Sequence, residues 1–197
     1  GYPEACNAAA GKIKIIYGIE DYFIDDIKEP DKTYKELRSY HQIILVKNHI
    51  GLKNLYKLIS KSNIDYFYKK PRMPKSEIMN HREGLIIGSA CEAGELYRAI
   101  LEERPEQEIM EIASFYDYLE IQPVGNNRFM IDAHSDPSAK NPDKNKEFDK
   151  ITCIEDIENI NRKVIAIADK LGKPVVATCD VHFIDPEDAK YRAILMA

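Results

Sequence analysis

Short apolar runs recur along the chain, separated by longer stretches in which apolar and polar residues are mixed. Apolar runs of this length predict buried strands, and they occur at residues 12–17, 42–46, 84–88, 118–122 and 174–177. Apolar side chains three and four positions apart predict helices at residues 5–10, 34–38, 52–59, 76–81, 92–102, 105–115, 154–171 and 188–197. Strands that alternate with helices predict an α/β fold, with a mostly parallel sheet or a barrel.

The boundaries of these elements carry further signals. Asn48 precedes the helix at 52–59, and Gly172 follows the helix at 154–171, where a left-handed residue ends many helices. Residues 65–74 are rich in aromatic and basic side chains and are predicted to form a loop. Residues 125–148 are polar, and a second loop is predicted within them at residues 135–146.

Composition and charge narrow the class of protein. The chain has 197 residues, of which 44% are hydrophobic and 31% charged, as is typical of a folded, soluble domain. Its net charge of -5 provides no overall basic field for nucleic acid. The four cysteines are scattered without a CxxC pair, which argues against a zinc ribbon and a secreted disulfide scaffold. No apolar run approaches the ~20 residues of a membrane span, so we expect a cytoplasmic protein without membrane contact.

Residues suited to metal binding follow three of the predicted strands. Glu20 comes after the first strand, Cys91 after the third, and Asp180 and His182 after the fifth, whereas His41 opens the second. If the strands are parallel, the three positions that follow strands converge on one rim of the sheet. Carboxylate, imidazole and thiolate are all ligands of zinc and similar divalent ions.

Each of these residues also has a purely structural explanation. Asp180 and His182 precede Asp185 and Pro186, which begin the next helix, and Glu20 is equally suited to a helix cap. Cysteine is among the most frequently buried residues, so Cys91 also fits an ordinary core position. His41 lies at the opposite end of its strand from the other candidates, which weakens its geometric case.

A set of ordered motifs extends over nearly the whole chain. They are IYGIE at 16–20, HQIILVKN at 41–48, GLKNL at 51–55, YFYKKPRMPKS at 66–76, GSACEAGE at 88–95, YLEIQP at 118–123 and KPVVATCDVHF at 173–183. Together they resemble the PHP (polymerase and histidinol phosphatase) domain. More narrowly, they resemble that domain in PolC-type DNA polymerase III α subunits of low-GC Gram-positive bacteria.

The resemblance implies a distorted seven-stranded α/β barrel of the PHP type with a site for several metal ions on one rim. Its matching ligands are Glu20, His41, Cys91, Asp180 and His182. The family's first ligand motifs, a His-x-His, an Asp and an Asp-His pair, are not found in residues 1–197. We therefore expect a PHP domain fragment without its opening strands, and a site depleted in divalent ions, whether Zn, Mn or Mg.

A second departure from the family lies at residues 21–40. PolC-type proteins carry an inserted proofreading exonuclease at this point, whereas this chain has about twenty residues and no Asp-x-Glu exonuclease motif. The parent is expected to be a DNA-directed DNA polymerase that acts in replication with DNA, the rest of its own chain and replisome subunits. For this fragment the resemblance implies either a metal-binding scaffold or a vestigial phosphoesterase. A free-standing phosphoesterase of the histidinol-phosphatase kind is the alternative, which the polymerase-type motifs disfavour.

The aromatic and basic segment has two interpretations. Stacking on bases and contacts to phosphates would make it a single-strand nucleic-acid site, with these candidate residues: Tyr66, Tyr68, Lys69, Lys70 and Arg72. A loop packed against a neighbouring polymerase domain explains the same composition. We favour the packing interpretation, because one short basic segment on an acidic chain is little evidence for nucleic-acid binding.

Overall fold

The structure is a computed structural model that describes residues 2–132 and 148–196. Its helices are α1 (Tyr2–Ala9), α2 (His49–Ile64), α3 (Lys75–Asn80), α4 (Glu95–Leu101), α5 (Glu106–Phe115), η1 (Val124–Asn127), α6 (Phe129–Asp132), α8 (Ile154–Leu171), η3 (Pro186–Asp188) and α9 (Ala189–Met196). Its strands are β1 (Gly18–Ile24), β2 (Ser39–Val46), β3 (Phe67–Tyr68), β4 (Lys70–Pro74), β5 (Leu85–Gly88), β6 (Leu119–Ile121) and β7 (Val175–Ala177).

Within the described residues the strands form a five-stranded sheet of mixed direction and a two-stranded parallel sheet. One has the order β3-β4-β1-β2-β5 and the other pairs β6 with β7 in parallel. Gly88, at the end of β5, forms a parallel β-bridge with Tyr118, which precedes β6, so the two sheets lie side by side. β2 is antiparallel to both β1 and β5, whereas β1 and β4 are parallel. The α/β class is confirmed, but the prediction of a mostly parallel sheet is wrong for its central strands.

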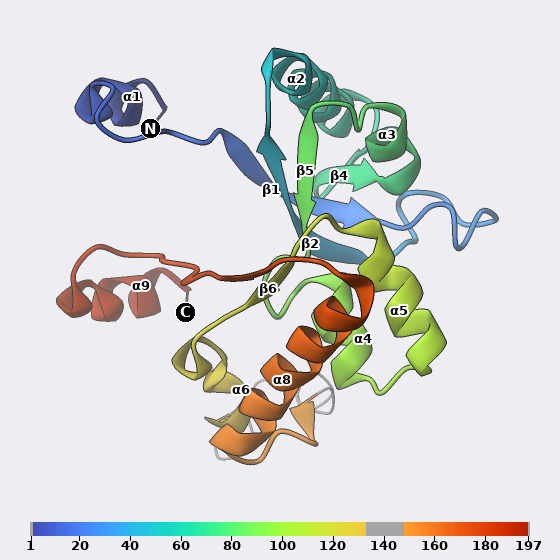
Figure 1. Ribbon diagram of the computed structural model, residues 1–197, viewed down its shortest axis with the longest axis vertical. Helices are drawn as coiled ribbons and strands as arrows, with labels where there is room; N and C mark the ends of the chain where they lie inside the picture. The colour runs from blue at the N-terminus through green and yellow to red at the C-terminus, as the bar shows by residue number, and fades with distance from the viewer. Residues whose placement is uncertain (1, 133–147, 197) are drawn as a thin grey trace.

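The two faces of the β1–β2 pair have different environments. Side chains alternate between faces along a strand, and Phe23 and Ile44 point into a core with the buried side chains of α2, α3, α4 and α5. These helices and α8 lie on one side of the strands, and α1 and α9 project on the other (Figure 1). The opposite face of β1 and β2 carries Glu20, His41 and Ile43, which are partly or fully exposed. This face can therefore hold a binding site.

The first predicted strand is displaced along the chain. Residues 12–17 are not a strand, and Ile13 and Ile16 are 71% and 57% exposed. The ladder begins at Gly18, after a last hydrogen bond from the Val46 amide to the Tyr17 carbonyl at 2.8 Å. β2 ends there and leads into α2, so residues 12–17 have no partner strand among the described residues. Glu20 consequently lies within a strand and not after one.

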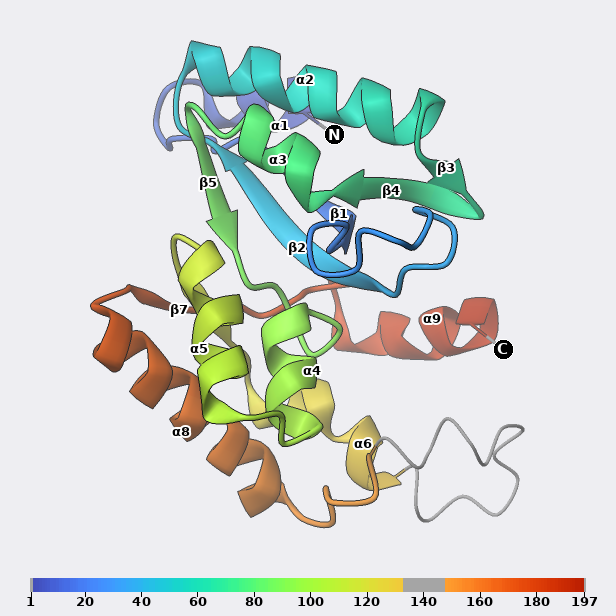
Figure 2. The ribbon, with the colours of Figure 1, turned by 90° about the vertical axis from the view of Figure 1, so that its right-hand side faces the viewer.

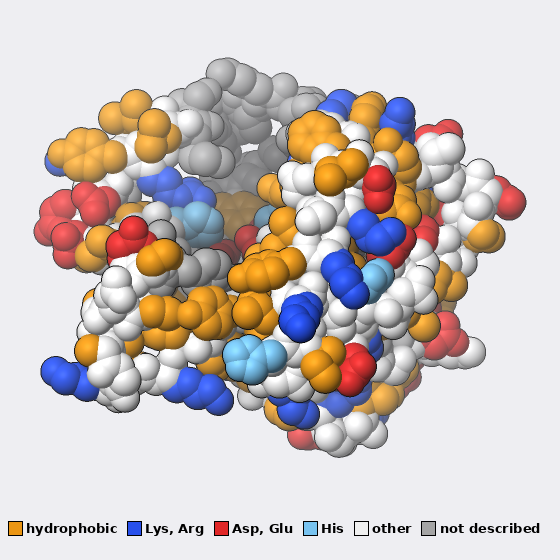
Figure 3. Space-filling model, turned by 90° about the horizontal axis from the view of Figure 1, so that it is seen from above, with side chains coloured by type: hydrophobic (Ala, Val, Ile, Leu, Met, Phe, Trp, Pro, Cys, Tyr) orange, Lys and Arg blue, Asp and Glu red, His pale blue; other side chains and the backbone are white. Residues whose placement is uncertain are grey.

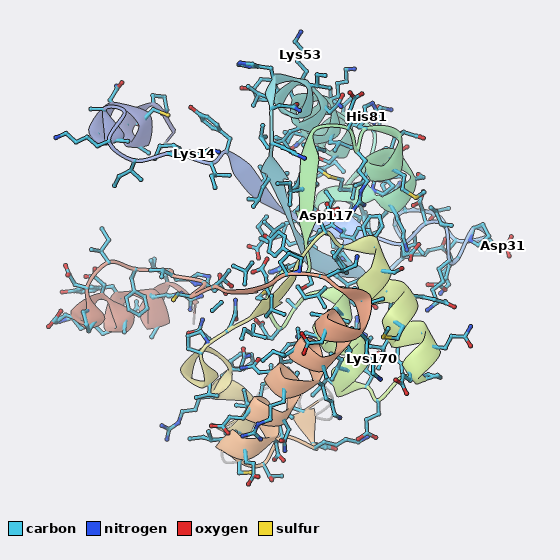
Figure 4. The ribbon with its side chains drawn as sticks, in the orientation of Figure 1. Lys14, Asp31, Lys53, His81, Asp117 and Lys170 are labelled. Atoms are coloured by element: carbon cyan, nitrogen blue, oxygen red, sulfur yellow. The ribbon has the colours of Figure 1, made fainter. Side chains whose placement is uncertain are left out.

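The predicted helix at 34–38 is a series of turns instead. The buried Arg72 side chain donates through Nη1 to the carbonyl oxygens of Tyr34 at 2.8 Å and Leu37 at 2.6 Å. In a helix these carbonyl oxygens would accept hydrogen bonds from backbone N–H groups. Here they accept from the Arg72 side chain of β4 instead. Asp31 marks the outer end of this β1–β2 connection and points away from the strands (Figure 4).

The segment at 65–74, predicted as a loop, contains the hairpin β3–β4. β4 pairs with β1 in parallel from Tyr22 and Arg72 to Ile24 and Pro74, which adds this segment to the main sheet. The other helices and strands were predicted to within a few residues, including α2, which Asn48 caps through its side chain, and α8, which ends at the left-handed Gly172. The loop predicted at 135–146 lies outside the described residues, and η1 and α6 lie in the polar stretch before it.

In Figure 2, α4, α5 and α8 lie side by side in the lower half of the molecule, and α2 runs along its top. The Ile157, Ile160 and Val164 side chains of α8 are buried, as its apolar stripe predicted. In the part of the chain that the structure describes, none of the helices combines the length and the apolar character that crossing a membrane requires.

Candidate metal centre

Glu20 and His41 are brought together by the antiparallel register of β1 and β2. Glu20 lies opposite Ile43, so His41 is its diagonal neighbour on the same face of the sheet. The Glu20 Oε1 and His41 Nδ1 atoms are 3.1 Å apart. The sequence-based concern that His41 lies at the wrong end of its strand depended on parallel strands, and the antiparallel pairing removes it.

Cys91 joins this pair from the turn between β5 and α4. Its Sγ atom lies 3.5 Å from His41 Nδ1 and 3.9 Å from Glu20 Oε1. The turn is tight, because Ala90 has a left-handed φ of 59° and a Cβ atom at Gly94 would lie 2.2 Å from the Ser89 carbonyl oxygen. Cys91 is 6% exposed, so one buried sulfur faces two partly exposed nitrogen and oxygen donors.

The charges of these three groups depend on one another. The hydrogen bond with His41 lowers the pKa of Glu20, and the same bond with Glu20 raises the pKa of His41. Burial raises the pKa of the Cys91 thiol, and the nearby Glu92 carboxylate raises it further. The protein without a metal ion therefore favours a charged Glu20–His41 pair and a protonated thiol. A cation that binds here displaces protons, which couples its affinity to pH.

Asp180 and His182 enter the same region from the segment after β7. Asp180 has a left-handed φ of 48°, and its carboxylate lies within 4.8 Å of the ligand atoms of Cys91 and Glu92. The His182 Nδ1 atom lies 2.7 Å from the Asp180 carbonyl oxygen. Because a carbonyl only accepts, this Nδ1 carries the proton, and Nε2 is the atom left to coordinate a metal.

Glu92 is a possible ligand that the sequence reasoning missed. It belongs to the second of two groups of potential ligand atoms among the described residues, which share the Cys91 sulfur. The groups are Glu20, His41 and Cys91, and Cys91, Glu92 and Asp180. Glu92 follows Cys91 directly, and adjacent residues match no ligand spacing of a helix or a strand. Its only signal was its place in the GSACEAGE motif.

All five predicted ligands line one cavity of about 660 Å³. Arg192, Asn126 and Phe129 also line it, which adds a cation and apolar contacts to the acidic and imidazole groups. Seen from above, the surface is hollowed on its left side, with histidine side chains visible in the hollow (Figure 3). Carboxylate, imidazole and thiolate fit a divalent ion, and three ligands per group leave positions open for water or a phosphate oxygen.

The aromatic and basic hairpin has a more internal environment than its composition indicates. Arg72 is buried against the β1–β2 connection, and the Tyr66 hydroxyl donates to the Glu77 carboxylate at 3.1 Å. Lys70 Nζ lies 3.8 Å from the centre of the Tyr22 ring, and Tyr22 in turn contacts His41 edge to face. Lys69 is exposed. A nucleic-acid role for this segment stays a prediction, and it concerns Lys69 and Lys70 more than Arg72.

Comparison with known proteins assigns the chain to a family. The chain is 48% identical over 184 residues to the PolC-type DNA polymerase III of Clostridium perfringens and 48% identical over 164 residues to that of Thermotoga maritima. It is 41% identical over 165 residues to that of Bacillus subtilis. These matches cover 83–90% of the chain but only 10–12% of the length of the relatives. The family model of the PHP domain matches residues 1–132, and the chain belongs to the PHP domain family.

Proposed function

We propose that this chain is the PHP part of a PolC-type DNA polymerase III, and that its cavity holds divalent metal ions. The proposed ligands are Glu20, His41, Cys91, Asp180 and His182. The observation that carries the proposal is the convergence of three donor atoms from three separate segments, with distances of 3.1, 3.5 and 3.9 Å between them. Chance proximity of surface acids does not explain a buried thiol facing a carboxylate and an imidazole.

The favoured role is that of a metal-stabilised scaffold. The ligands come from β1, β2, the turn after β5 and the segment after β7, so one bound ion would cross-link segments that are distant in the sequence. Ligands that bind the folded state alone increase its stability. In this proposal the fold is the PHP barrel with residues 21–40 as the site of insertion, and the parent acts on DNA in the cytoplasm with replisome subunits.

Elemental analysis and a cysteine variant test the metal proposal. The purified protein, loaded with Zn²⁺ or Mn²⁺ and desalted, should retain the metal. Cys91→Ser should lower the bound-metal ratio, whereas Cys153→Ser should not, because Cys153 lies at the exposed N-terminus of α8. Equal metal content in the Cys91→Ser and wild-type proteins would contradict the ligand assignment, and a wild type that retains no metal would contradict the site.

A phosphoesterase is the second candidate, and the lining of the cavity favours it. Arg192 lies in the same cavity as the acidic and imidazole ligands, where its guanidinium can bind phosphate oxygens. A divalent ion, when bound, supplies a water of lowered pKa and neutralises charge on the phosphate. Hydrolysis of an artificial phosphodiester with added Mn²⁺, abolished by Asp180→Ala, would favour this role. Metal binding without turnover would favour the scaffold.

A further inference from the structure

A buried carboxyl group lies directly behind the proposed metal ligands and is not one of them. Glu120 is in β6, is 7% exposed, and lines a second cavity of about 550 Å³. The same cavity is lined by Glu20, Cys91 and Asp180, so it adjoins the metal centre. The neighbouring Leu119 is fully buried in the core, which places Glu120 on the opposite face of the strand, toward the cavity.

Glu120 is bonded to both of the segments that carry the cysteine and aspartate ligands. Its backbone N–H donates to Ser89 Oγ at 2.9 Å, and Ser89 precedes Cys91 by two residues. Its carboxylate Oε2 accepts from Thr178 Oγ1 at 2.9 Å, and Thr178 precedes Asp180 by two residues. One residue of β6 thus bridges the turn after β5 and the end of β7.

Both of these segments adopt a backbone conformation that needs support. Ala90, next to Cys91, and Asp180 itself are non-glycine residues with left-handed φ angles of 59° and 48°. Such conformations persist where the surrounding contacts fix them. Ser89 is one residue from Ala90, and Thr178 is two residues from Asp180. The bonds from Glu120 to Ser89 and Thr178 therefore fix the backbone next to the ligand residues Cys91 and Asp180.

The environment of Glu120 is otherwise costly for a carboxyl group. Burial raises its pKa, against hydrogen bonds from Thr178, Tyr118 and the Ala90 backbone. Its second oxygen, Oε1, is buried without a hydrogen-bond partner in the described structure. An apolar residue would avoid this cost in an ordinary core and would keep the backbone bond to Ser89, so the carboxyl group is accounted for by its bond from Thr178 and by negative charge near a cation site.

We propose that Glu120 is a positioning residue, which holds the Cys91 and Asp180 segments at the separation that a shared metal site requires. The inference rests on the proposed metal-binding function. Groups that hydrogen-bond directly to metal ligands typically change metal affinity by about 10- to 100-fold when they are removed, and Glu120 acts one step further out, through Ser89 and Thr178. We expect a loss toward the lower end of that range for Glu120→Gln, which keeps the size of the side chain but replaces the carboxylate that accepts from Thr178 with a neutral, weaker acceptor.

Zinc affinity and the cobalt spectrum test the proposal in the intact chain. Glu120→Gln and Thr178→Val should each weaken Zn²⁺ binding and weaken the thiolate-to-cobalt charge-transfer band of the Co²⁺-loaded protein. Gln122→Leu is the control, because Gln122 has the same 7% exposure and lines the same cavity without a side-chain bond to either segment. Circular dichroism confirms the folded fraction of each variant.

The outcomes separate this inference from the function on which it rests. A wild type that binds neither Zn²⁺ nor Co²⁺ would overturn the metal site itself. A wild type that binds, with a folded Glu120→Gln variant of equal affinity and an equal cobalt band, would overturn the positioning role alone. If Glu120→Gln does not fold, Thr178→Val decides, since valine matches threonine in shape and removes the donor. An unchanged affinity in Thr178→Val would then reject the proposal.

Discussion

Glu20 and His41 face one another diagonally across the β1–β2 ladder, with Oε1 and Nδ1 3.1 Å apart. This pair forms because the two strands are antiparallel. In that register Glu20 lies opposite Ile43, which makes His41 its neighbour on the same face although both residues lie near the starts of their strands. The buried thiol of Cys91 then completes a group of three donors. The register of the two strands thus determines whether these donor atoms meet, and several measurable consequences follow from the packing around them.

Metal binding should raise the melting temperature, and His41 should be needed for the shift. At a free Zn²⁺ concentration 100 times the dissociation constant, binding stabilises the folded state by about 2.7 kcal/mol, or roughly 5–10 °C for a domain of this size. Thermal denaturation of chelated and reloaded protein measures the effect. His41→Ala should abolish it, and His49→Ala should not, because His49 is exposed at the start of α2. An equal shift in both variants would contradict the assignment of His41.

Stability should fall as the pH rises through neutrality because of Glu95. Burial raises the pKa of this carboxyl group to about 7, against the attraction of Lys75. A carboxyl group with a raised pKa binds its proton more tightly in the folded state. Its stabilising effect is therefore complete below the usual pKa near 4.5 and is lost as the pH rises through about 7.

For Glu95 the loss between pH 5 and pH 8 is on the order of 3 kcal/mol in the free energy of unfolding. Glu95→Gln cannot ionise, so it should flatten this slope and be the more stable protein at pH 8. Urea denaturation of both proteins at several pH values measures the difference. Parallel pH profiles for the wild type and the variant would show that the carboxyl group is not protonated in the folded state.

Arg72 should contribute to stability more than to nucleic-acid binding. Arg72→Ala leaves the carbonyl oxygens of Tyr34 and Leu37 without their donor and is expected to destabilise the protein by about 2 kcal/mol or more. Lys69→Ala removes an exposed charge of the same hairpin and should change stability by less than about 0.5 kcal/mol. Chemical denaturation compares the two. Any affinity for single-stranded DNA should depend on Lys69. If Arg72→Ala folds and loses DNA affinity while Lys69→Ala keeps it, the assignment of these two roles is wrong.

Gly51→Ala should destabilise the protein although it lies in a helix. Alanine normally favours a helix interior by roughly 0.5–1 kcal/mol. A Cβ atom at Gly51, however, would lie 1.8 Å from the Gly84 carbonyl oxygen, and backbone atoms cannot move aside as a flexible side chain can. Overpacking of this kind costs about 3 kcal/mol, so the unfavourable term is larger. Gly125→Ala, where no atom lies within 4 Å, is the matched control and should be nearly neutral in denaturation experiments.

Sequence patterns predicted the helices better than the sheet. Asn48 and Gly172 mark helix boundaries through local hydrogen bonds and a left-handed φ angle, and both signals depend only on nearby residues. The direction of β2 and the start of β1 depend on pairing across the chain instead. Residues 12–17 are more β-branched than 18–24, yet only the latter lie beside β2 along its length. No pattern within either segment contains that information.

The candidate site was foreseen residue by residue but not in its geometry. Glu20, His41, Cys91, Asp180 and His182 were named from motifs, and the structure brings them to one cavity. Their arrangement depends on long-range packing. The buried role of Arg72 could not be read from composition, since its partners are backbone carbonyls nearly forty residues away. The bridge from Glu120 to Ser89 and Thr178 likewise joins three segments with no common motif.

The β1–β2 connection has a consequence for how this domain can change in size. Ile24 and Ser39 are direct partners in the ladder, so the chain leaves the sheet and returns to it at adjacent points. The entropy cost of closing a longer excursion grows only with the logarithm of its length. A whole folded domain whose own termini lie close together can therefore be inserted or lost between Ile24 and Ser39 during evolution, while the pairing of β1 with β2 stays the same.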